Sequence, residues 1–139
     1  MKFSSAIVLL LIGLLIVSCK TNRVVKNERV GKWIFKDTFG GKHYTTKGNY
    51  RKGLETGTWK QFSGNKLVKK QLYNKQICFT TFYNENGTVM ARGKSRMVIT
   101  DKLVHWFYYD DWKYYDGEGN LESIRTYENG EEVNELIIK

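Results

Sequence analysis

The side chains that could carry out catalysis or bind a metal are sparse in this chain. The only histidines, His43 and His105, are 62 residues apart, and each stands beside an aromatic residue in a strand-like segment. A metal site needs three or four ligands at suitable spacing, and no cluster of cysteine and histidine residues supplies them. No nucleophile elbow and no phosphate-binding glycine loop is present. The sequence therefore predicts a protein that is not an enzyme, with no catalytic residue, no metal and no cofactor.

One acidic segment, residues 110–122, has a pattern that merits comparison with a calcium loop. Its oxygen-bearing side chains alternate from Asp116 onward. An EF-hand loop needs glycine at its sixth position and glutamate at its twelfth. Counted from Asp116, these positions hold Leu121 and Tyr127. We therefore interpret the segment as a hairpin turn.

Cys19 is a candidate for covalent modification. It follows a positively charged start and an almost wholly apolar run, a pattern typical of a secretory signal that is too short to span a bilayer comfortably. The tetrapeptide Ile16-Val17-Ser18-Cys19 resembles the lipobox of bacterial lipoproteins. That resemblance implies lipidation of Cys19, cleavage between Ser18 and Cys19, and a signal peptide over residues 1–18, expected to be helical.

The same resemblance bears on location. A lipidated Cys19 would anchor the protein to a membrane of the cell envelope. Lys20 follows the predicted anchor, whereas an aspartate there is associated with retention at the inner membrane. The expected location is therefore the outer membrane rather than the inner membrane.

The second cysteine, Cys78, has a different predicted role. It lies in a strand-like run with no histidine or cationic pocket beside it in the sequence. A reactive thiol needs such a neighbour, whereas a free cysteine in a strand behaves as a small buried hydrophobe. We predict the buried role, and a lipidated Cys19 would leave no intrachain disulfide.

Charge is distributed unevenly. Residues 20–96 carry 18 Lys and Arg against 4 Asp and Glu, and residues 97–139 carry 4 against 10. A basic domain with an acidic end would suit anionic headgroups, envelope phosphates or an acidic protein, and the alternatives are a solubilising surface or two copies packed head to tail. Basic residues among aromatic ones also occur in nucleic-acid binders, but the export signal argues against a nucleic acid as partner. The densest basic cluster, and our candidate contact for anionic lipid, consists of Lys66, Lys69, Lys70 and Lys75.

A recurring sequence pattern of aromatic residues and glycines predicts the strands and turns that position the candidate side chains. An aromatic pair recurs at one spacing, as Trp59 and Phe62, Trp106 and Tyr109, and Trp112 and Tyr115. Self-similarity of this kind indicates a repeat architecture. The intervening segments are rich in glycine and asparagine, which favour tight hairpin turns, and proline is absent. We predict an all-β fold over residues 31–139, an extended antiparallel meander of repeated hairpins, preceded by an anchor and tether over residues 19–30.

The spacing of the aromatic pairs also predicts which face each side chain occupies. Residues three apart on a strand point to opposite faces, so Trp59 and Phe62 should lie on opposite sides of the sheet. Both faces then carry apolar surface, and such a sheet must curl, stack or find a partner. The candidate protein contact is Trp106, Tyr109, Trp112 and Tyr115, because Trp and Tyr are enriched at interface hot spots. The alternative for these residues is packing between repeats.

Several of these segments resemble MORN-type repeats in their bacterial variant form. The best match is Gly53-Leu54-Glu55-Thr56-Gly57-Thr58-Trp59, and the likeness covers about residues 31–132. Other copies depart from the pattern, since no glycine precedes Trp106. The resemblance implies an extended, twisted β-meander in a binding or scaffolding module, with phospholipid contact proposed for some members. We therefore expect a non-enzymatic envelope lipoprotein that contacts anionic lipid headgroups or an envelope protein. The alternative is an antitoxin-like or immunity-like protein that neutralises one protein partner.

Overall fold

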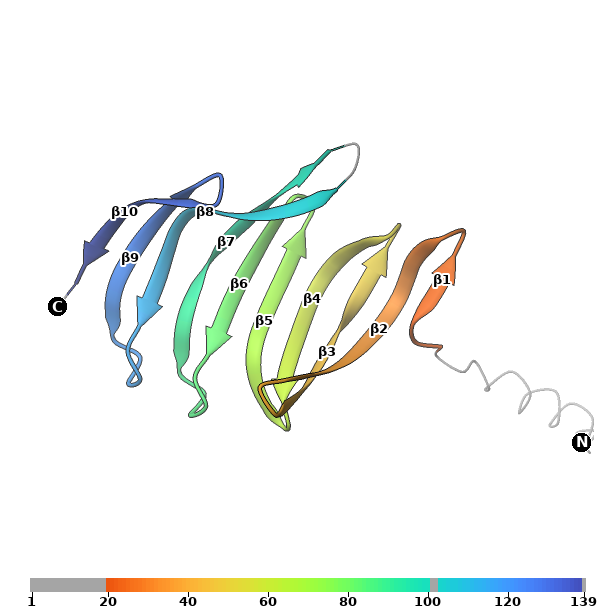
Figure 1. The fold of residues 1–139 in the computed structure, drawn as a ribbon, viewed down its shortest axis with the longest axis horizontal. Helices are drawn as coiled ribbons and strands as arrows, with labels where there is room; N and C mark the ends of the chain where they lie inside the picture. The colour runs from red at the N-terminus through yellow and green to blue at the C-terminus, as the bar shows by residue number, and fades with distance from the viewer. Residues whose placement is uncertain (1–19, 101–102, 139) are drawn as a thin grey trace, which may run out of the picture.

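The computed structural model describes residues 20–100 and 103–138, which form one antiparallel sheet (Figure 1). Ten strands lie side by side in chain order, and no helix occurs in these residues. The predicted all-β antiparallel meander is therefore confirmed. The predicted signal peptide, with Ser18 and Cys19, lies outside the described residues. Within them, no helix has the length and apolar character needed to cross a membrane.

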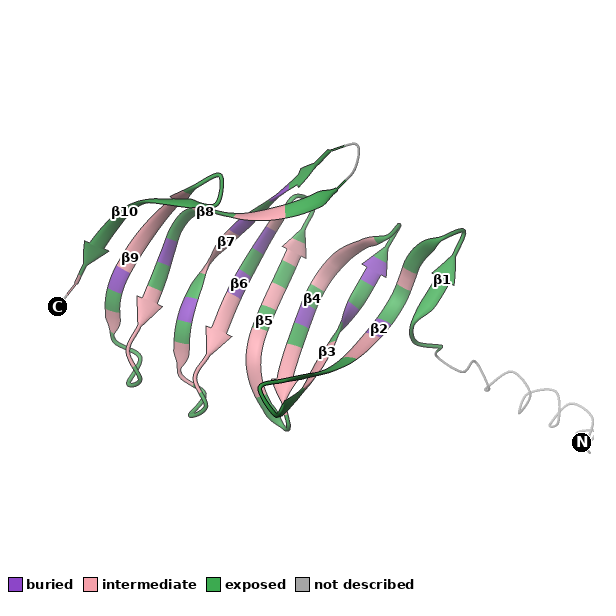
Figure 2. Ribbon diagram, in the orientation of Figure 1, coloured by how far each residue is buried: buried purple, intermediate pink, exposed green. Residues whose placement is uncertain are grey.

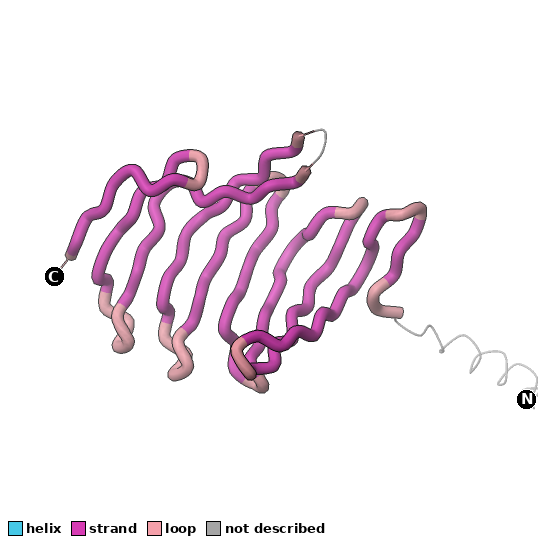
Figure 3. The backbone as a smooth tube through the Cα atoms, viewed as in Figure 1, coloured by secondary structure: helices cyan, strands magenta, loops and turns pink. Residues whose placement is uncertain are grey.

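The strands are β1 (Arg23–Val25), β2 (Glu28–Phe39), β3 (Lys42–Arg51), β4 (Leu54–Ser63), β5 (Lys66–Asn74), β6 (Ile77–Tyr83), β7 (Val89–Ile99), β8 (Val104–Tyr115), β9 (Leu121–Glu128) and β10 (Glu131–Ile137). Short turns join them, and Figure 3 shows the loops confined to the two ends of the strands. In the turn between β1 and β2, Lys26 and Asn27 have φ values of 50° and 63°. Positive φ at both central residues matches the twist of a hairpin, which is why such turns favour asparagine and glycine.

The sheet begins earlier in the chain than residue 31. β1 and the start of β2 lie within residues 20–30, for which the sequence predicted a tether. Asn22 is already held to the sheet, because its side chain accepts a hydrogen bond from the Ile34 N–H (2.8 Å) and donates one to the Ile34 carbonyl (3.0 Å). Only Lys20 and Thr21 therefore separate Cys19 from a residue bonded to the sheet.

One face of the sheet carries the hydrophobic core, and we call it the aromatic face. Side chains alternate between faces along a strand, and Figure 2 shows buried positions interspersed with exposed ones along β3, β6 and β7. When this alternation is followed across the strand register, the buried side chains all fall on the aromatic face. They are Trp33, Tyr50, Trp59, Cys78, Thr80, Ala91, Ser95, Met97, Trp112 and Ser123.

Two tryptophans lie flat over glycines of the neighbouring strand. Trp59 covers Gly48, and Trp112 covers Gly93, so closely that a Cβ atom on either glycine would overlap the ring. Each glycine sits at an irregularity in strand pairing. Each indole also donates its N–H to the carbonyl of the residue after the glycine, over 3.2 Å for Trp59 and 2.8 Å for Trp112. These two glycine–tryptophan units are the structural repeat of the sheet.

Other aromatic rings cover each tryptophan, so a single sheet can bury them. Tyr50 and Tyr73 pack edge-on to Trp59, with ring centroids 5.0 and 6.4 Å away. Tyr108 stacks on Trp112 at 4.0 Å, and Tyr127 meets the same ring edge-on at 6.5 Å. Aromatic pairs in these geometries each add about 1 kcal/mol beyond the apolar area that they bury. The core is therefore a layer of rings on one face, with no second sheet.

Candidate binding face

The opposite face gathers cations from most of the strands, and we call it the basic face. The register places there Lys32, Lys47, Lys60, Lys70, Arg92, Lys94, Arg96 and Lys113. Four of these eight residues come from β2 to β5 and four from β7 and β8, so they are spread widely along the sequence. The antiparallel meander brings them onto one surface because each hairpin returns its residues to the same face.

Three of these lysines are direct neighbours across adjacent strands. Lys47 pairs with Lys60, and Lys60 pairs with Lys70. We call these three residues the lysine row. Like charges directly opposite one another destabilise a sheet, and among the described residues no lysine of the row forms an ion pair. The row therefore stands on the sheet without a counter-charge of its own.

A shallow depression of about 380 Å³ lies along the lysine row. Its lining contains no carboxylate and consists of Lys32, Lys47, Gly48, Asn49, Thr58, Lys60 and Lys70. Gly48 lines it because the Trp59 ring occupies the other side of that glycine. All four lysines are exposed. The arrangement suits an anion that approaches the face from solvent.

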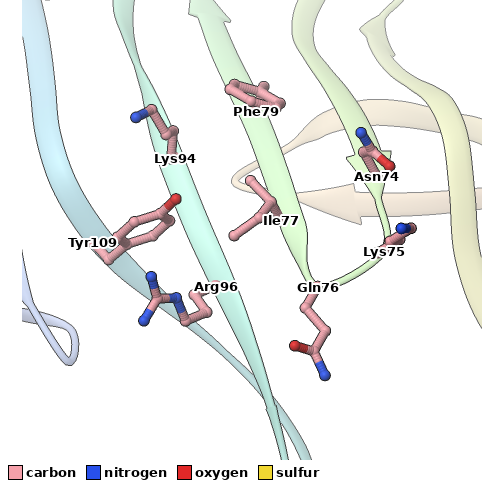
Figure 4. Close-up of a pocket in the computed structure, with 8 residues that line it drawn as sticks. All are labelled: Asn74, Lys75, Gln76, Ile77, Phe79, Lys94, Arg96 and Tyr109. Carbon is pink, nitrogen blue, oxygen red and sulfur yellow. The ribbon is translucent and has the colours of Figure 1, made fainter.

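A second, larger depression of about 670 Å³ lies farther along the basic face, and we call it the Phe79 depression (Figure 4). Ile77 and Phe79 on β6 form its floor, between Tyr109 on one side and Asn74 on the other. Phe79 is 46% exposed. Its lining is completed by Lys75, Gln76, Lys94 and Arg96.

The cations around the Phe79 depression differ in what they contact. Lys94 places its Nζ 2.5 Å from Asp110 Oδ2. The guanidinium of Arg96 lies 4.5 Å from the ring centroid of Tyr109, and among the described residues Arg96 forms no ion pair. A guanidinium stacked on a ring keeps its N–H groups free for another acceptor. Arg96 is therefore the cation of this depression that is best placed to meet an anion.

The structure separates the four lysines that the sequence grouped together. Lys70 belongs to the lysine row, but Lys69 points to the aromatic face, where burial lowers the pKa of its ammonium group. Lys66 is the first residue of β5, whereas Lys75 lies in the turn after β5, at the opposite end of the strand. Lys75 lines the Phe79 depression. Sequence reasoning missed Lys32, Lys47 and Lys60, and strand register is the signal that finds them.

The four aromatic residues predicted to contact a protein are also divided between the faces. Trp106 and Trp112 lie on the aromatic face, and Trp112 is only 1% exposed. Tyr109 and Tyr115 lie on the basic face, where Arg96 and Arg92 stack on their rings. Trp59 and Phe62 likewise lie on opposite faces, since the Nζ of Lys47 sits 4.7 Å over the Phe62 ring.

The remaining candidate residues have structural contacts. Cys78 is a free thiol that is 1% exposed, as predicted, and burial raises its pKa. His43 hydrogen-bonds Thr38 through Nδ1 (2.9 Å), and His105 stacks on Phe107. Within the described residues, no group of three or more His, Cys, Asp or Glu side chains is arranged to hold a metal ion.

The acidic segment that was compared with a calcium loop closes a hairpin turn. The Asp116 carboxylate accepts hydrogen bonds from the backbone N–H groups of Glu118 (2.9 Å) and Asn120 (2.8 Å), and from the Asn120 side chain (3.0 Å). The side-chain bond from Asn120 is the largest influence that lowers the pKa of Asp116. A carboxylate engaged in this way organises the turn.

The turn gives a pH-dependent prediction. Because the pKa of Asp116 is lower in the fold than in the unfolded chain, its contribution to stability is present above the unfolded value of about 3.9 and is lost as the pH falls through the folded value. Asp116→Asn removes this proton linkage. We expect the difference in unfolding free energy between wild type and variant to shrink as the pH falls from about 5 to about 2. Urea unfolding across that range measures it, and a constant difference would contradict the assignment.

Comparison of the chain with known proteins identifies no relative. No family model matches the chain, and no curated protein or solved structure matches it.

Proposed function

We propose that this chain is a lipid-anchored binding module of the bacterial cell envelope, held through Cys19, whose basic face binds an anionic component of the envelope. The observation that carries the proposal is the lysine row. Lys47, Lys60 and Lys70 stand side by side, and no carboxylate within residues 20–100 and 103–138 forms an ion pair with them. The likeness of the first nineteen residues to a signal sequence with a lipobox supports the envelope location, the likeness to MORN-type repeats supports a binding role, and Lys20 supports the outer membrane.

An anionic surface fits the basic face better than a single small ion does. Lysines and arginines near an anionic membrane each contribute about 1 kcal/mol to binding. The cations of this face are spread over strands from β2 to β8, so an extended surface can engage several of them together.

The short connection to Cys19 supports contact with the surface that holds the anchor. Asn22 is hydrogen-bonded to Ile34, and the three residue steps from Cys19 to Asn22 span at most about 10 Å when extended. A lipidated Cys19 would therefore keep the β1 end of the sheet close to the headgroups.

Co-sedimentation with vesicles tests this function. Residues 20–139 hold every strand of the sheet. We expect them to bind phosphatidylglycerol vesicles and not phosphatidylcholine vesicles, with binding that weakens as salt is raised. Replacing Lys47, Lys60 and Lys70 together by Gln should weaken binding about 100-fold, because each lysine contributes about 1 kcal/mol to the binding free energy.

The matched control changes three lysines that lie outside the basic face. Lys26 and Lys52 are in turns, and Lys66 is at the end of a hairpin. Replacing these three by Gln makes the same change in net charge, and we expect a much smaller loss of binding. Equal losses for the two triple variants would contradict a site on the basic face. No binding at low salt would reject the anionic surface and favour the immunity-like alternative with a protein partner.

A further inference from the structure

The Phe79 depression differs in chemistry from the lysine row. The row offers ammonium groups alone, whereas the depression combines an apolar floor with amides and cations around it (Figure 4). Small-molecule sites have this composition, with apolar walls and a few convergent polar groups, and volumes of about 300–1,000 Å³. At about 670 Å³ the depression lies within that range.

Each part of the lining matches one part of a phosphorylated sugar. The C–H groups of a sugar ring are weakly positive and pack on the negative face of an aromatic ring such as Phe79. The amides of Asn74 and Gln76 both donate and accept hydrogen bonds, as hydroxyl groups require. The guanidinium of Arg96, which lies beside Tyr109 (Figure 4), matches phosphate oxygens.

The residues that line the depression argue against a bare phosphate or an acyl chain as its ligand. A bare phosphate would gain nothing from the exposed ring of Phe79 or from Ile77. An acyl chain would make no use of the hydrogen-bonding amides of Asn74 and Gln76. The span also fits, because Asn74 on β5 and Tyr109 on β8 are separated by three strand spacings, or about 14 Å. That distance accommodates a sugar ring with a phosphate beside it.

We infer that the Phe79 depression binds a phosphorylated sugar. The inference rests on the proposed function for its setting, since the envelope presents such sugars as lipid headgroups. It adds a specific site to a face that otherwise attracts anions by charge. A free sugar phosphate has the same chemistry, so the experiment must distinguish the two sources.

The test compares two kinds of vesicle at equal surface charge. One carries a bis-phosphorylated disaccharide lipid, and the other carries phosphatidylglycerol. We expect wild-type protein to bind the first at least tenfold more tightly. Phe79→Ser should remove most of that preference and leave phosphatidylglycerol binding within about twofold. Equal binding of wild type to the two vesicles would overturn the inference.

Leu72→Ser is the matched control. Leu72 is the cross-strand partner of Phe79, lies on the same face and is 45% exposed, but it does not line the depression. We expect it to keep the preference. Because both side chains are substantially exposed, both variants should fold, which their thermal unfolding checks. Equal effects of the two substitutions would overturn the inference.

Competition with soluble compounds distinguishes a free sugar phosphate from a lipid-linked one as the ligand. Displacement by free glucosamine 6-phosphate, but not by inorganic phosphate, would support recognition of the sugar phosphate itself. A Phe79-dependent preference without displacement by the free sugar would support the lipid-linked form. Equal displacement by inorganic phosphate would overturn the inference. The proposed function fails separately, through loss of phosphatidylglycerol binding in the wild type.

Discussion

Alanine at Gly93 is expected to lower the unfolding free energy by about 3 kcal/mol, at the upper end of the usual range for overpacking. A Cβ atom there would overlap the Trp112 ring. The ring cannot easily move, because its N–H is bonded to the Lys94 carbonyl at 2.8 Å and Tyr108 stacks on it at 4.0 Å. Gly48→Ala should have the same effect through Trp59, whose hydrogen bond is longer at 3.2 Å.

Urea unfolding of the variants measures this effect. Gly117→Ala is the matched control, because Gly117 has no positive φ and a Cβ atom there would meet nothing within 4 Å. It should change the unfolding free energy by less than about 0.5 kcal/mol. Equal effects at Gly93 and Gly117 would show that the rings do not require glycine beneath them.

Trp112→Ala is expected to lower the unfolding free energy by about 3–5 kcal/mol, the usual loss for a large buried aromatic residue. Trp112 is 1% exposed, and its ring contacts Phe82, Tyr108 and Tyr127. Removing it would open a cavity at the centre of its cluster. The variant should be largely unfolded at moderate urea concentration, as judged by circular dichroism.

Trp106→Ala provides the comparison. Trp106 is only partly buried, and its ring packs against Tyr73 at 5.3 Å. We expect a clearly smaller loss than for Trp112→Ala. Similar losses would contradict the view that the glycine–tryptophan unit, and not tryptophan content alone, holds the sheet together.

The strands and turns were predictable because local chemistry determines them. Aromatic pairs three residues apart placed Trp59 and Phe62 on opposite faces, as the structure shows. Glycine and asparagine identified the turns. The start of the sheet was not predictable in this way, because β1 is only Arg23–Val25 and the hydrogen bonds of the Asn22 side chain to Ile34 link residues 12 positions apart.

The basic face required the register of the whole meander. Lys47 and Lys60 are far apart in sequence, and their pairing lies beside an irregularity at Gly48. A sequence pattern does not reveal such a shift, and a shift of one residue moves side chains to the other face. The opposite faces of Lys69 and Lys70 do follow from alternation alone, so this part of the arrangement is predictable from the sequence.

The lysine row links stability to binding. Repulsion between neighbouring lysines lowers stability, and residues at functional sites commonly break the rules that stabilise the rest of a fold. If the row exists to bind an anion, relieving its repulsion should improve the fold and impair binding. A variant that merely misfolds would lose both.

The most direct measurement is therefore made on Lys60→Glu, with Lys52→Glu as the control in a turn. We expect binding to phosphatidylglycerol vesicles to fall at least about tenfold for Lys60→Glu, while its unfolding free energy stays the same or rises by about 0.5 kcal/mol. Lys52→Glu should change binding much less. Unchanged binding by Lys60→Glu would show that the basic face is not the binding surface.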